Sequence, residues 1–546
     1  MAHSDAALRW ENVGLSIRER PILKGITLSV DRGECLALVG ESGSGKTLCC
    51  MAALGMLPDG GELTSGRIEG LGQLWQTADG AATHPVPRGD RLAMVFQEPM
   101  TSLDPTMRCG RQLQRVIERH SHTDDCPVPD RVRHLLEEVQ MPDVERAIRA
   151  FPHELSGGQK QRILIAMALS NDPDILLADE PTTALDSTLR ADLLSLLRDL
   201  QRQRGLAMVL VTHDMDVVER HADRVAVLYR GEVVEQGRVE RVLSSPQHPY
   251  TRGLLACRIP TSGRPTPLPV MAAFLGDGPA PAPAADIESV PLTAESLLSV
   301  QGATKTYPGQ VEPAIRDVSL TLPFGGSLGI VGGSGCGKTT LARAILGLHR
   351  LDSGSITLAG RDVQAGTADD LQHIRSHAGL VFQDPRAALN PAKRIGSVLE
   401  EVLIRWGTPR GAAHDEAGAL LEAVGLSRSD LDKRPDAFSG GQRQRIVIAR
   451  ALAARPQLLI CDEAVAALDV SVQAQVLNLL VELQAERNLA LLFISHDLGV
   501  VRYLCDHTVV MDRGSVVEAA ESESIWSTPK HPVTRRLQAA GGGSID

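Results

Sequence analysis

The feature that most constrains this chain is an internal repeat that spans most of its 546 residues. Motifs recur in the same order and with nearly the same spacing in the two halves. GESGSGKT (40–47) recurs as GGSGCGKT (332–339), VFQEP (95–99) as VFQDP (381–385), LSGGQKQR (155–162) as FSGGQRQR (438–445), and VTHD (211–214) as ISHD (494–497). The sequence therefore predicts two domains built on one plan.

The segment between the two copies, residues 258–296, is rich in proline and alanine and has no sustained period. Proline favours extended conformers, so we predict a semi-rigid linker, with a docking segment as the alternative. The first domain then spans 1–257 and the second spans 297–540. The tail GGGSID, 541–546, is interpreted as a tag or linker remnant.

Each copy reads as a strand, a glycine-rich loop, a helix, a helical insertion and then alternating strands and helices. This order predicts an α/β fold with a mostly parallel sheet. The runs ILLA (175–178) and LLIC (458–461) are continuously apolar, as expected for strands that are buried on both faces. Each run delivers an acidic pair at the end of its strand, where open α/β sheets bind ligands.

The pattern G-x4-G-K-T is typical of a phosphate-binding loop, in which backbone N–H groups surround an anion. The lysine reaches the β- and γ-phosphates of a nucleotide, and the threonine hydroxyl faces Mg²⁺. The alternative, a glycine-rich turn before a helix, is weakened because a strand ending in an acidic pair follows in both halves. The predicted phosphate-binding residues are Gly40, Ser42, Gly43, Gly45, Lys46, Thr47, Gly332, Ser334, Gly335, Gly337, Lys338 and Thr339.

The acidic pairs supply the groups that hydrolysis of a phosphoanhydride needs. Asp179 and Asp462 are predicted to hold Mg²⁺, while Glu180 and Glu463 polarise the attacking water. The alternative is a structural acidic pair at the end of a strand.

The motif SGGQ precedes an apolar-periodic helix in both copies. A serine N-cap followed by two glycines exposes backbone donors at a helix N-terminus, which favours an anion. Because each half already has a phosphate loop, this second anion site makes sense if it binds the nucleotide of the other half. The residues are Ser156, Gly157, Gly158 and Gln159 in the first copy, and Ser439, Gly440, Gly441 and Gln442 in the second.

With these motifs the chain resembles the ATP-binding-cassette (ABC) ATPases, with two cassettes fused. The resemblance implies two tandem P-loop NTPase domains, each with a mostly parallel sheet core, an antiparallel subdomain and a helical subdomain. It also implies that the cassettes pair head to tail within the chain and hold two ATP molecules between them. One site then joins Lys46, Gln97, Asp179, Glu180 and His213 to Ser439, Gly440 and Gly441, and the other joins Lys338, Gln383, Asp462, Glu463 and His496 to Ser156, Gly157 and Gly158.

The same resemblance gives roles to several of these residues. Gln97 and Gln383 resemble the glutamines that approach the metal, and His213 and His496 resemble the switch histidines that contact the γ-phosphate. Asp186 and Asp469 resemble the aspartates that link the two sites. The implied cofactors are ATP and Mg²⁺.

A narrower resemblance is to the oligopeptide/dipeptide importer family. VFQEPMTSLDPTMRCGRQL and VFQDPRAALNPAKRIGSVL are similar to its Q-loop regions, and HPYTRGLL (248–255) and HPVTRRL (531–537) to its cassette ends. It implies an ATPase that drives solute import, peripheral to the cytoplasmic face of the plasma membrane. The implied partners are two integral membrane permease subunits and an extracytoplasmic binding protein, with peptide, nickel-chelate, glutathione or opine-like cargo. Only Cys257 follows the HPYTR motif, so we predict no iron–sulfur cluster.

Composition sets further limits. The net charge of −11 argues against a nucleic-acid partner. One alternative is a soluble twin-cassette ATPase that acts on ribosomes or nucleic acid. It is weakened because the linker has few charges and the sequence has no zinc-type cysteine pairs. A second alternative, the motor of an exporter, is disfavoured by the importer motifs. The nine cysteines form no CxxC pair, which indicates a reducing compartment. No apolar run is long enough to predict a membrane span, and the N-terminal segment does not predict a signal peptide. RHSHTDDC (119–126) is interpreted as a solvated loop, with a metal site as the alternative.

The copies differ in two notable places. CDEAVAALD (461–469) lacks the proline and threonines of ADEPTTALD (178–186), but these changes remove no ligand or base, so the second copy is predicted to work. In ABC ATPases an aromatic residue stacks on adenine. Tyr307 fits this role in the second copy, whereas our alignment places Ile17 there in the first, which predicts weaker ATP binding by a few-fold.

Overall fold

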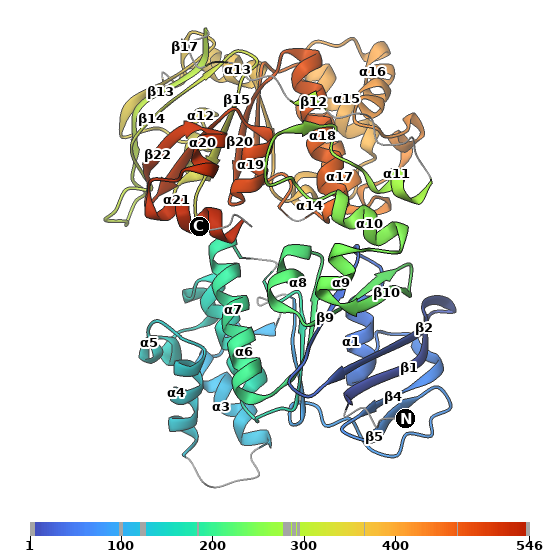
Figure 1. Cartoon of the computed structure of the whole chain (residues 1–546). Coiled ribbons are helices and arrows are strands. Elements are labelled where there is room, and N and C mark those ends of the chain that lie inside the picture. Colours follow the sequence, from blue (N-terminus) through green and yellow to red (C-terminus); the bar gives the residue numbers. More distant parts are fainter. Residues whose placement is uncertain are drawn as a thin grey trace. The chain divides into compact units, whose positions relative to one another are not determined.

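The structure is a computed structural model that describes residues 6–97, 102–120, 127–182, 185–276, 285–286, 291, 295–364, 366–466 and 468–541. The chain divides into two compact units, which are coloured blue to green and green to red in Figure 1. The first comprises Met1–Leu185, Leu189–Ala256 and Met271–Gly278, and the second comprises Asp186–Thr188, Cys257–Val270 and Pro279–Asp546. This confirms the prediction of two tandem α/β cassettes.

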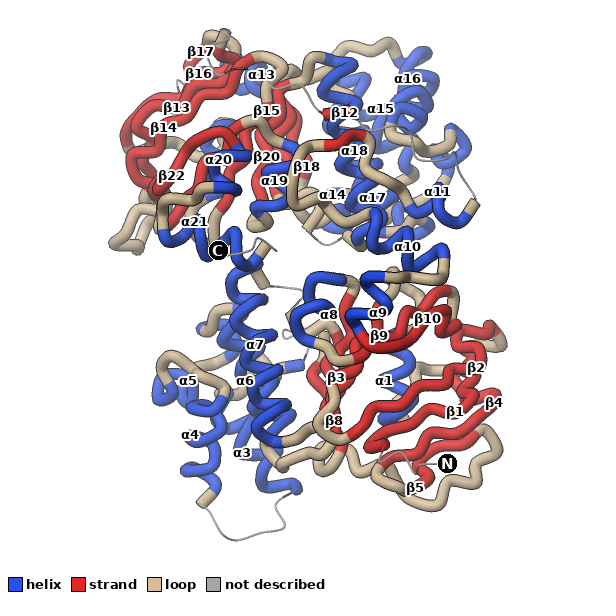
Figure 2. The backbone as a smooth tube through the Cα atoms, viewed as in Figure 1, coloured by secondary structure: helices blue, strands red, loops and turns tan. Residues whose placement is uncertain are grey.

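The first unit contains two sheets, which Figure 2 shows in red. An antiparallel sheet has the order β2-β1-β4-β5, and a mostly parallel sheet has the order β10-β9-β3-β8-β7-β6. The strands are β1 (Ala6–Ile17), β2 (Arg20–Asp31), β3 (Cys35–Val39), β4 (Gly61–Gly70), β5 (Gln73–Thr77), β6 (Leu92–Val95), β7 (Ile175–Asp179), β8 (Ala207–Thr212), β9 (Arg224–Tyr229) and β10 (Glu232–Arg238). The fully buried strands β3, β7 and β8 confirm the expected two-sided burial.

The helices of the first unit fall into two groups. The helical subdomain holds α3 (Cys109–His120), α4 (Val128–Glu138), α5 (Val144–Arg149), the short η1 (Pro152–Glu154), α6 (Gly157–Leu169) and α7 (Ser187–Arg204). The others are α1 (Lys46–Leu54), α8 (Met215–His221), α9 (Val239–Ser244), α10 (Pro249–Ala256) and α11 (Met271–Leu275). One apolar core lies under the helical subdomain and another joins the antiparallel sheet to α1, so each subdomain has a core of its own.

The second unit repeats this plan, with sheet orders β14-β13-β16-β17 and β18-β19-β20-β15-β21-β22. Its strands are β13 (Ser296–Lys305), β14 (Ile315–Pro323), β15 (Ser327–Val331), β16 (Ser353–Leu358), β17 (Arg361–Asp362), β18 (Ala378–Val381), β19 (Leu458–Asp462), β20 (Ala490–Ser495), β21 (His507–Asp512) and β22 (Ser515–Glu521). Its helices are α12 (Lys338–Ile345), α13 (Ala368–His377), α14 (Pro385–Ala388), α15 (Ile395–Arg405), α16 (Arg410–Ala423), η2 (Arg428–Asp432), η3 (Pro435–Ala437), α17 (Gly440–Leu452), α18 (Val470–Arg487), α19 (Leu498–Leu504), α20 (Ser522–Ser527) and α21 (Pro532–Ala540).

The first part of the predicted linker is docked on the second unit. Arg264 pairs with Asp506 at 2.8 Å, and the Leu268 backbone exchanges two hydrogen bonds with the Asn478 amide. Leu268 is 1% exposed and belongs to the main apolar core of that unit. Residues 258–270 of the predicted linker therefore pack as part of the second unit. Within this segment, Pro265–Thr266 forms the two-residue strand β11, which pairs with β12 (Ala285–Asp286).

In the described part of the chain, no helix is both long enough and apolar enough to cross a membrane.

Candidate functional site

The glycine-rich loop of the first unit runs from the end of β3 into α1. Gly40 has φ +151°, and a Cβ there would meet the Leu228 carbonyl oxygen at 2.2 Å, so the loop lies directly against β9. Gly45 caps α1 in the left-handed conformation with φ +107°. Lys46 folds back and donates from Nζ to the carbonyl oxygens of Gly40 at 2.7 Å and Glu41 at 3.0 Å. The predicted cradle is therefore formed, with its lysine buried beside the loop backbone.

The second unit has the same loop between β15 and α12. Gly337 caps α12 with φ +106°, and Lys338 Nζ donates to Gly332 O at 2.7 Å and Gly333 O at 2.9 Å. Cys336 stands where the first copy has Ser44, and its Sγ lies 3.8 Å from Lys338 Nζ. The two loops hold their lysines in nearly identical positions.

The first acid of each pair faces the loop threonine. Thr47 Oγ1 donates to Asp179 Oδ1 at 3.2 Å, and Thr339 Oγ1 donates to Asp462 Oδ1 at 3.5 Å. Burial raises the pKa of Asp179 to about 6; the charge of Glu180 acts in the same direction, while Thr47 and Lys46 oppose the rise. The pKa of Asp462 is also raised, mainly by burial. A buried carboxylate beside a threonine hydroxyl is a donor set that fits Mg²⁺, because a divalent cation would offset the burial of the negative charge.

The second acid of each pair is held between a glutamine and a histidine. Gln97 Nε2 donates to Glu180 Oε2 at 2.8 Å, and His213 Nδ1 lies 3.3 Å from Glu180 Oε1. In the second unit, Gln383 Nε2 donates to Glu463 Oε2 at 2.6 Å, and His496 Nδ1 lies 3.5 Å from Glu463 Oε1. The hydrogen bond from His496 lowers the pKa of Glu463, although burial opposes this.

Both glutamates have left-handed backbones, with φ +42° at Glu180 and +50° at Glu463. This conformation is uncommon for residues other than glycine and costs about 1 kcal/mol or more, so it persists where the surroundings impose it. Glu180 N–H donates to Val211 O and Glu463 N–H to Ile494 O, which holds each bend against the neighbouring strand. The bend turns each carboxylate toward the histidine and glutamine.

The signature motifs form the predicted N-caps. Ser156 Oγ accepts a hydrogen bond from Gln159 N at 3.3 Å, and Gln159 Oε1 accepts one from Ser156 N at 3.0 Å, which makes a capping box at the start of α6. Ser439 and Gln442 repeat this box at the start of α17. Each signature therefore begins a helix of the helical subdomain, with Gly157, Gly158, Gly440 and Gly441 in the first turns.

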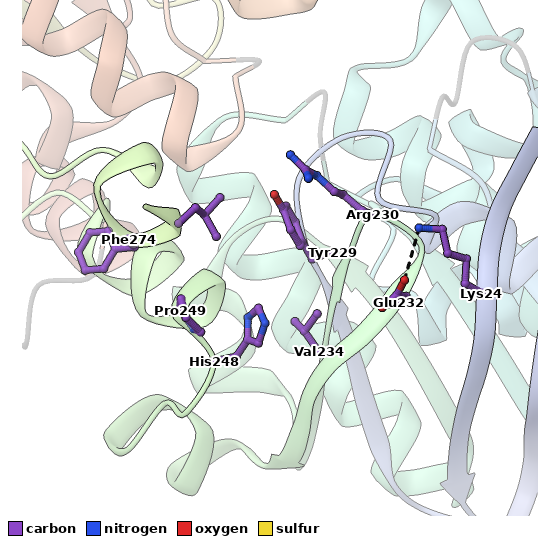
Figure 3. A pocket seen from close by; sticks show the side chains of 9 residues that line it. Lys24, Tyr229, Arg230, Glu232, Val234, His248, Pro249 and Phe274 are labelled. Atoms are coloured by element: carbon purple, nitrogen blue, oxygen red, sulfur yellow. Dashed lines mark hydrogen bonds and ion pairs between the residues drawn. The ribbon is translucent and has the colours of Figure 1, made fainter. Parts of the chain in front are cut away.

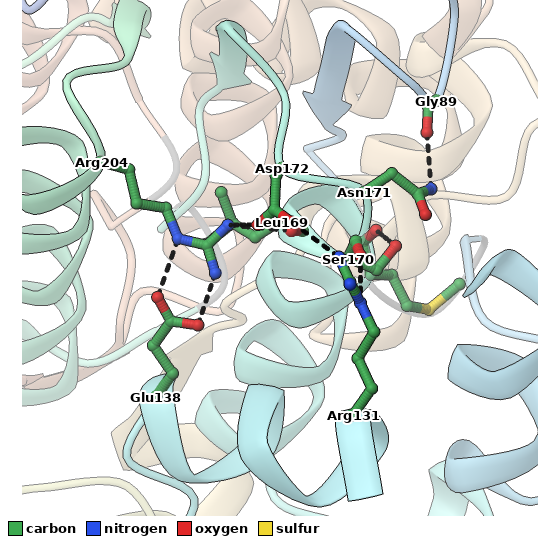
Figure 4. Close-up of polar contacts among 9 residues, drawn as sticks. Gly89, Arg131, Glu138, Leu169, Ser170, Asn171, Asp172 and Arg204 are labelled. Carbon is green, nitrogen blue, oxygen red and sulfur yellow. Dashed lines mark hydrogen bonds and ion pairs between the residues drawn. The ribbon is translucent and has the colours of Figure 1, made fainter. Parts of the chain in front are cut away.

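The C-terminal end of α6 is anchored by two arginines (Figure 4). Arg204 makes a bidentate pair with Glu138 and also donates to Leu169 O at 3.1 Å. Arg131 donates to Ser170 O and to Asp172 Oδ2, both at 2.7 Å. Because the arginines come from α4 and α7, these contacts fix the signature helix within the helical subdomain.

The remaining predicted residues lie near these loops or just before helices. Tyr307 Oη is 3.3 Å from Thr340 Oγ1, next to the loop threonine of the second unit. Ile17 is the last residue of β1, whose counterpart in the second unit is β13. Trp10 of β1 pairs with Leu28, and Val300 of β13 pairs with Leu320 in the same register. Counting from these pairs, Ile17 stands at the position that Tyr307 has in the second unit. Asp186 and Asp469 directly precede α7 and α18. Ala464 and Val465, the residues that replace proline and threonine, are buried in the core.

Sequence reasoning missed Tyr250, the tyrosine of HPYTR, as a residue that contacts the phosphate loop. Its hydroxyl accepts a hydrogen bond from Glu41 N at 2.8 Å, and its side chain is completely buried. The available signal was the difference between HPYTR in the first copy and HPVTR in the second.

Of the alternative metal site in RHSHTDDC, residues 121–126 lie outside the described residues. Elsewhere, within the ranges that the structure describes, no group of three or more potential metal ligands gathers.

Two family profiles match the chain. The ABC transporter profile matches residues 23–183 and 315–466, and the profile of the oligopeptide/dipeptide transporter C-terminal region matches residues 234–269. The chain is 42% identical to the glutathione import ATP-binding protein GsiA of Pectobacterium atrosepticum, over 95% of this chain and 86% of that protein. It is 38% identical to the protein of the same name from Escherichia coli O157:H7, over 99% and 91%.

Among solved structures, the chain is similar to cbiO1 from Clostridium perfringens, described as part of the ABC transporter complex cbiONQ. The identity is 26% and the TM-score is 0.40, over 43% of this chain and 92% of that one.

Proposed function

Because this chain belongs to the ABC transporter family, as an importer ATPase of the oligopeptide type, we propose that the solute whose import it drives is glutathione or a closely similar short peptide. The proposed cargo rests on the 42% identity to a glutathione import ATP-binding protein over 95% of the chain. That match covers both cassettes and the segment between them, rather than the cassette motifs alone. ATP hydrolysis itself follows from the two ABC domains.

Each cassette supplies a full set of groups for hydrolysis. Lys46 and Lys338, which bond to their own loop carbonyls in the structure, would turn to the phosphates of ATP when it enters the cradle. Thr47 with Asp179, and Thr339 with Asp462, would hold Mg²⁺, which neutralises phosphate charge when bound.

The glutamates would then orient the water. Glu180 and Glu463 would accept a hydrogen bond from the attacking water, while Gln97, Gln383, His213 and His496 hold these carboxylates in position. The left-handed backbone at both glutamates supports this role, because strain of this kind gathers at functional positions.

A further part of the proposal is that the two cassettes complete each other's sites. The signature of each copy would bind the ATP held by the phosphate loop of the other, since the capped N-termini of α6 and α17 offer backbone donors to an anion. Site one would join the Lys46 loop to Ser439, and site two the Lys338 loop to Ser156. The partners would be two membrane permease subunits and an extracytoplasmic binding protein, with this chain peripheral on the cytoplasmic face of the membrane.

The test is uptake of radiolabelled glutathione into cells that produce this chain with its two permease subunits and binding protein. We expect uptake that depends on this chain and is lost in the double variant Glu180→Gln plus Glu463→Gln. Uptake of other short peptides without glutathione would overturn the proposed cargo but not the import function. No chain-dependent uptake of any solute would overturn both.

A further inference from the structure

The first unit holds its phosphate loop with a contact that the second unit cannot make. Tyr250 Oη accepts the Glu41 N–H at 2.8 Å, and Tyr250 is completely buried. The Glu41 carbonyl on the other side of that residue accepts from Lys46 Nζ at 3.0 Å. Glu41 is therefore held from both sides, by a tyrosine of α10 and by the lysine of the loop.

Neighbouring aromatic and charged groups fix the ring of Tyr250. Tyr229, the last residue of β9, stacks on it with ring centroids 4.3 Å apart and planes at 29°. The other residues around Tyr229 line an open pocket of about 470 Å³, where Arg230 lies 4.9 Å from the centre of the Tyr229 ring and Lys24 pairs with Glu232 (Figure 3). Tyr250 thus has a packed aromatic partner, and its hydroxyl is aimed at the loop.

The backbone that carries Tyr250 is duplicated in the second unit. His248 Nδ1 accepts from Tyr250 N at 3.2 Å, and the N–H groups of Gln247 and His248 donate to Glu235. His531 Nδ1 likewise accepts from Val533 N at 3.3 Å, and Glu518 takes the place of Glu235. The same frame therefore presents tyrosine in the first unit and valine in the second.

The substitution is paired. Where the first unit has Tyr229 stacked on Tyr250, the second has Asp512 and Val533 at the corresponding positions. Valine has no hydroxyl, so the second phosphate loop lacks this acceptor. Another contact of the loop is shared, since Gly231 N donates to Ser44 O in the first unit and Gly514 N donates to Cys336 O in the second. Among the residues that the structure describes, the stack and the hydroxyl contact occur in the first unit and not in the second.

We propose that Tyr250 is a positioning residue of the first ATP site, and that it fixes the phosphate loop when Lys46 leaves the loop carbonyls for the phosphates of the nucleotide. Once Lys46 turns away, the Glu41 carbonyl loses that hydrogen bond and keeps the one from Ser44 N at 3.1 Å. The Tyr250 hydroxyl holds the Glu41 N–H throughout, and so helps to keep the loop in its binding shape. The first loop is therefore better preorganised than the second. This inference rests on the proposed assignment of the Lys46 loop as an ATP site.

The test measures nucleotide binding at one site at a time in the full chain. Lys338→Ala silences the second site, and titration with a fluorescent ATP analogue in the presence of Mg²⁺ then reports the first. We expect Tyr250→Phe, which keeps the ring stack, to weaken binding about five- to tenfold in this background, as expected for the loss of one buried hydrogen bond. In the reciprocal Lys46→Ala background, where the second site alone binds, Tyr250→Phe should leave the affinity unchanged.

Tyr229→Phe is the matched control, because it removes a hydroxyl from the same stack without touching the loop. It should leave binding at the first site unchanged. An unaltered first-site affinity in Tyr250→Phe would overturn the inference. Equal loss in both backgrounds would also overturn it, since that result indicates a general effect on folding. If the Lys338→Ala variant binds no analogue while the Lys46→Ala variant does, the proposed assignment of the Lys46 loop as an ATP site is wrong. That outcome differs from one in which the loop binds ATP but Tyr250 does not support it.

Discussion

Replacement of Arg264 by alanine tests whether the docked segment is part of the second unit. Arg264 donates to Asp506 Oδ1 at 2.8 Å, to Tyr503 O at 2.8 Å and to Leu504 O at 3.1 Å. The two carbonyls belong to the last turn of α19, where helix carbonyls lack intrahelical partners and a cation is favoured. The guanidinium therefore caps a helix and neutralises a buried acid at the same time.

The expected loss is large because both charges are buried, with side-chain exposures of 13% for Arg264 and 3% for Asp506. Breaking a buried ion pair from one side costs about 3–5 kcal/mol. Asp506 keeps its hydrogen bonds from Ser327 N at 3.2 Å and Ser327 Oγ at 2.9 Å, so we take the lower end of that range. A loss of about 3 kcal/mol corresponds to a fall in melting temperature of roughly 6–12 °C in a unit of this size.

Hydrogen exchange followed by mass spectrometry on the full chain separates the two units, which a single melting curve does not. We expect exchange in the peptides around α19 and β21 to speed up by about a hundredfold, the factor that corresponds to this loss, with the first unit unchanged. Arg487→Ala, an exposed arginine at the end of α18, is the control and should stay within about 0.5 kcal/mol of the parent. Equal exchange in Arg264→Ala and Arg487→Ala would refute the reasoning.

Three further predictions concern the sites and their supports. The double variant Glu180→Gln plus Glu463→Gln should keep ATP bound and lose at least about a hundredfold in hydrolysis rate; normal steady-state hydrolysis would contradict the role of the glutamates. Ser439→Arg should weaken nucleotide occupancy at the Lys46 loop and spare the Lys338 loop, as read by photocrosslinking of an ATP analogue; the reverse pattern would refute the exchange of signatures. Arg455→Asp should destabilise the second unit by about 0.5 kcal/mol through repulsion from Glu416, and Glu416→Arg should restore it, as measured by urea unfolding; additive losses would exclude the pairing.

Much of the fold and of the site could be predicted, because the groups predicted to contact nucleotide lie in short motifs whose conformation is local. The N-cap at Ser156 and the left-handed Gly45 depend on residues within one turn of each other. The resemblance to ABC ATPases put Gln97 and Glu180 in one predicted site with Gln97 approaching the metal, whereas in the structure Gln97 Nε2 donates to Glu180.

The missed contacts join residues that are far apart in the chain. Tyr250 meets Glu41 across 209 residues, and Arg264 meets Asp506 across 242. Composition indicated an extended linker at Arg264 because proline and alanine dominate the segment, but composition does not reveal that Leu268 fills a place in an apolar core. Such packing depends on the shape of a distant surface, which no local pattern in the segment records.

The two copies differ more in their supporting contacts than in the contacts of the site itself. The contacts of Gln, Glu and His repeat within a few tenths of an ångström, whereas the supports around them differ. In the first unit Arg131 pairs with Asp172; at the corresponding positions of the second, Glu416 pairs with Arg455, with the charges exchanged.

Other supports are present in one copy and missing from the other. Glu138, which holds Arg204, is replaced by Ala423, and Tyr250 is replaced by Val533. Groups that react must keep both identity and position, while a group that only holds a loop or a helix can be exchanged for any other that stabilises the same geometry. A difference between the two sites should therefore appear in how tightly each binds nucleotide, which Tyr250 favours in the first unit and Tyr307 in the second, rather than in the rate of hydrolysis once ATP is held.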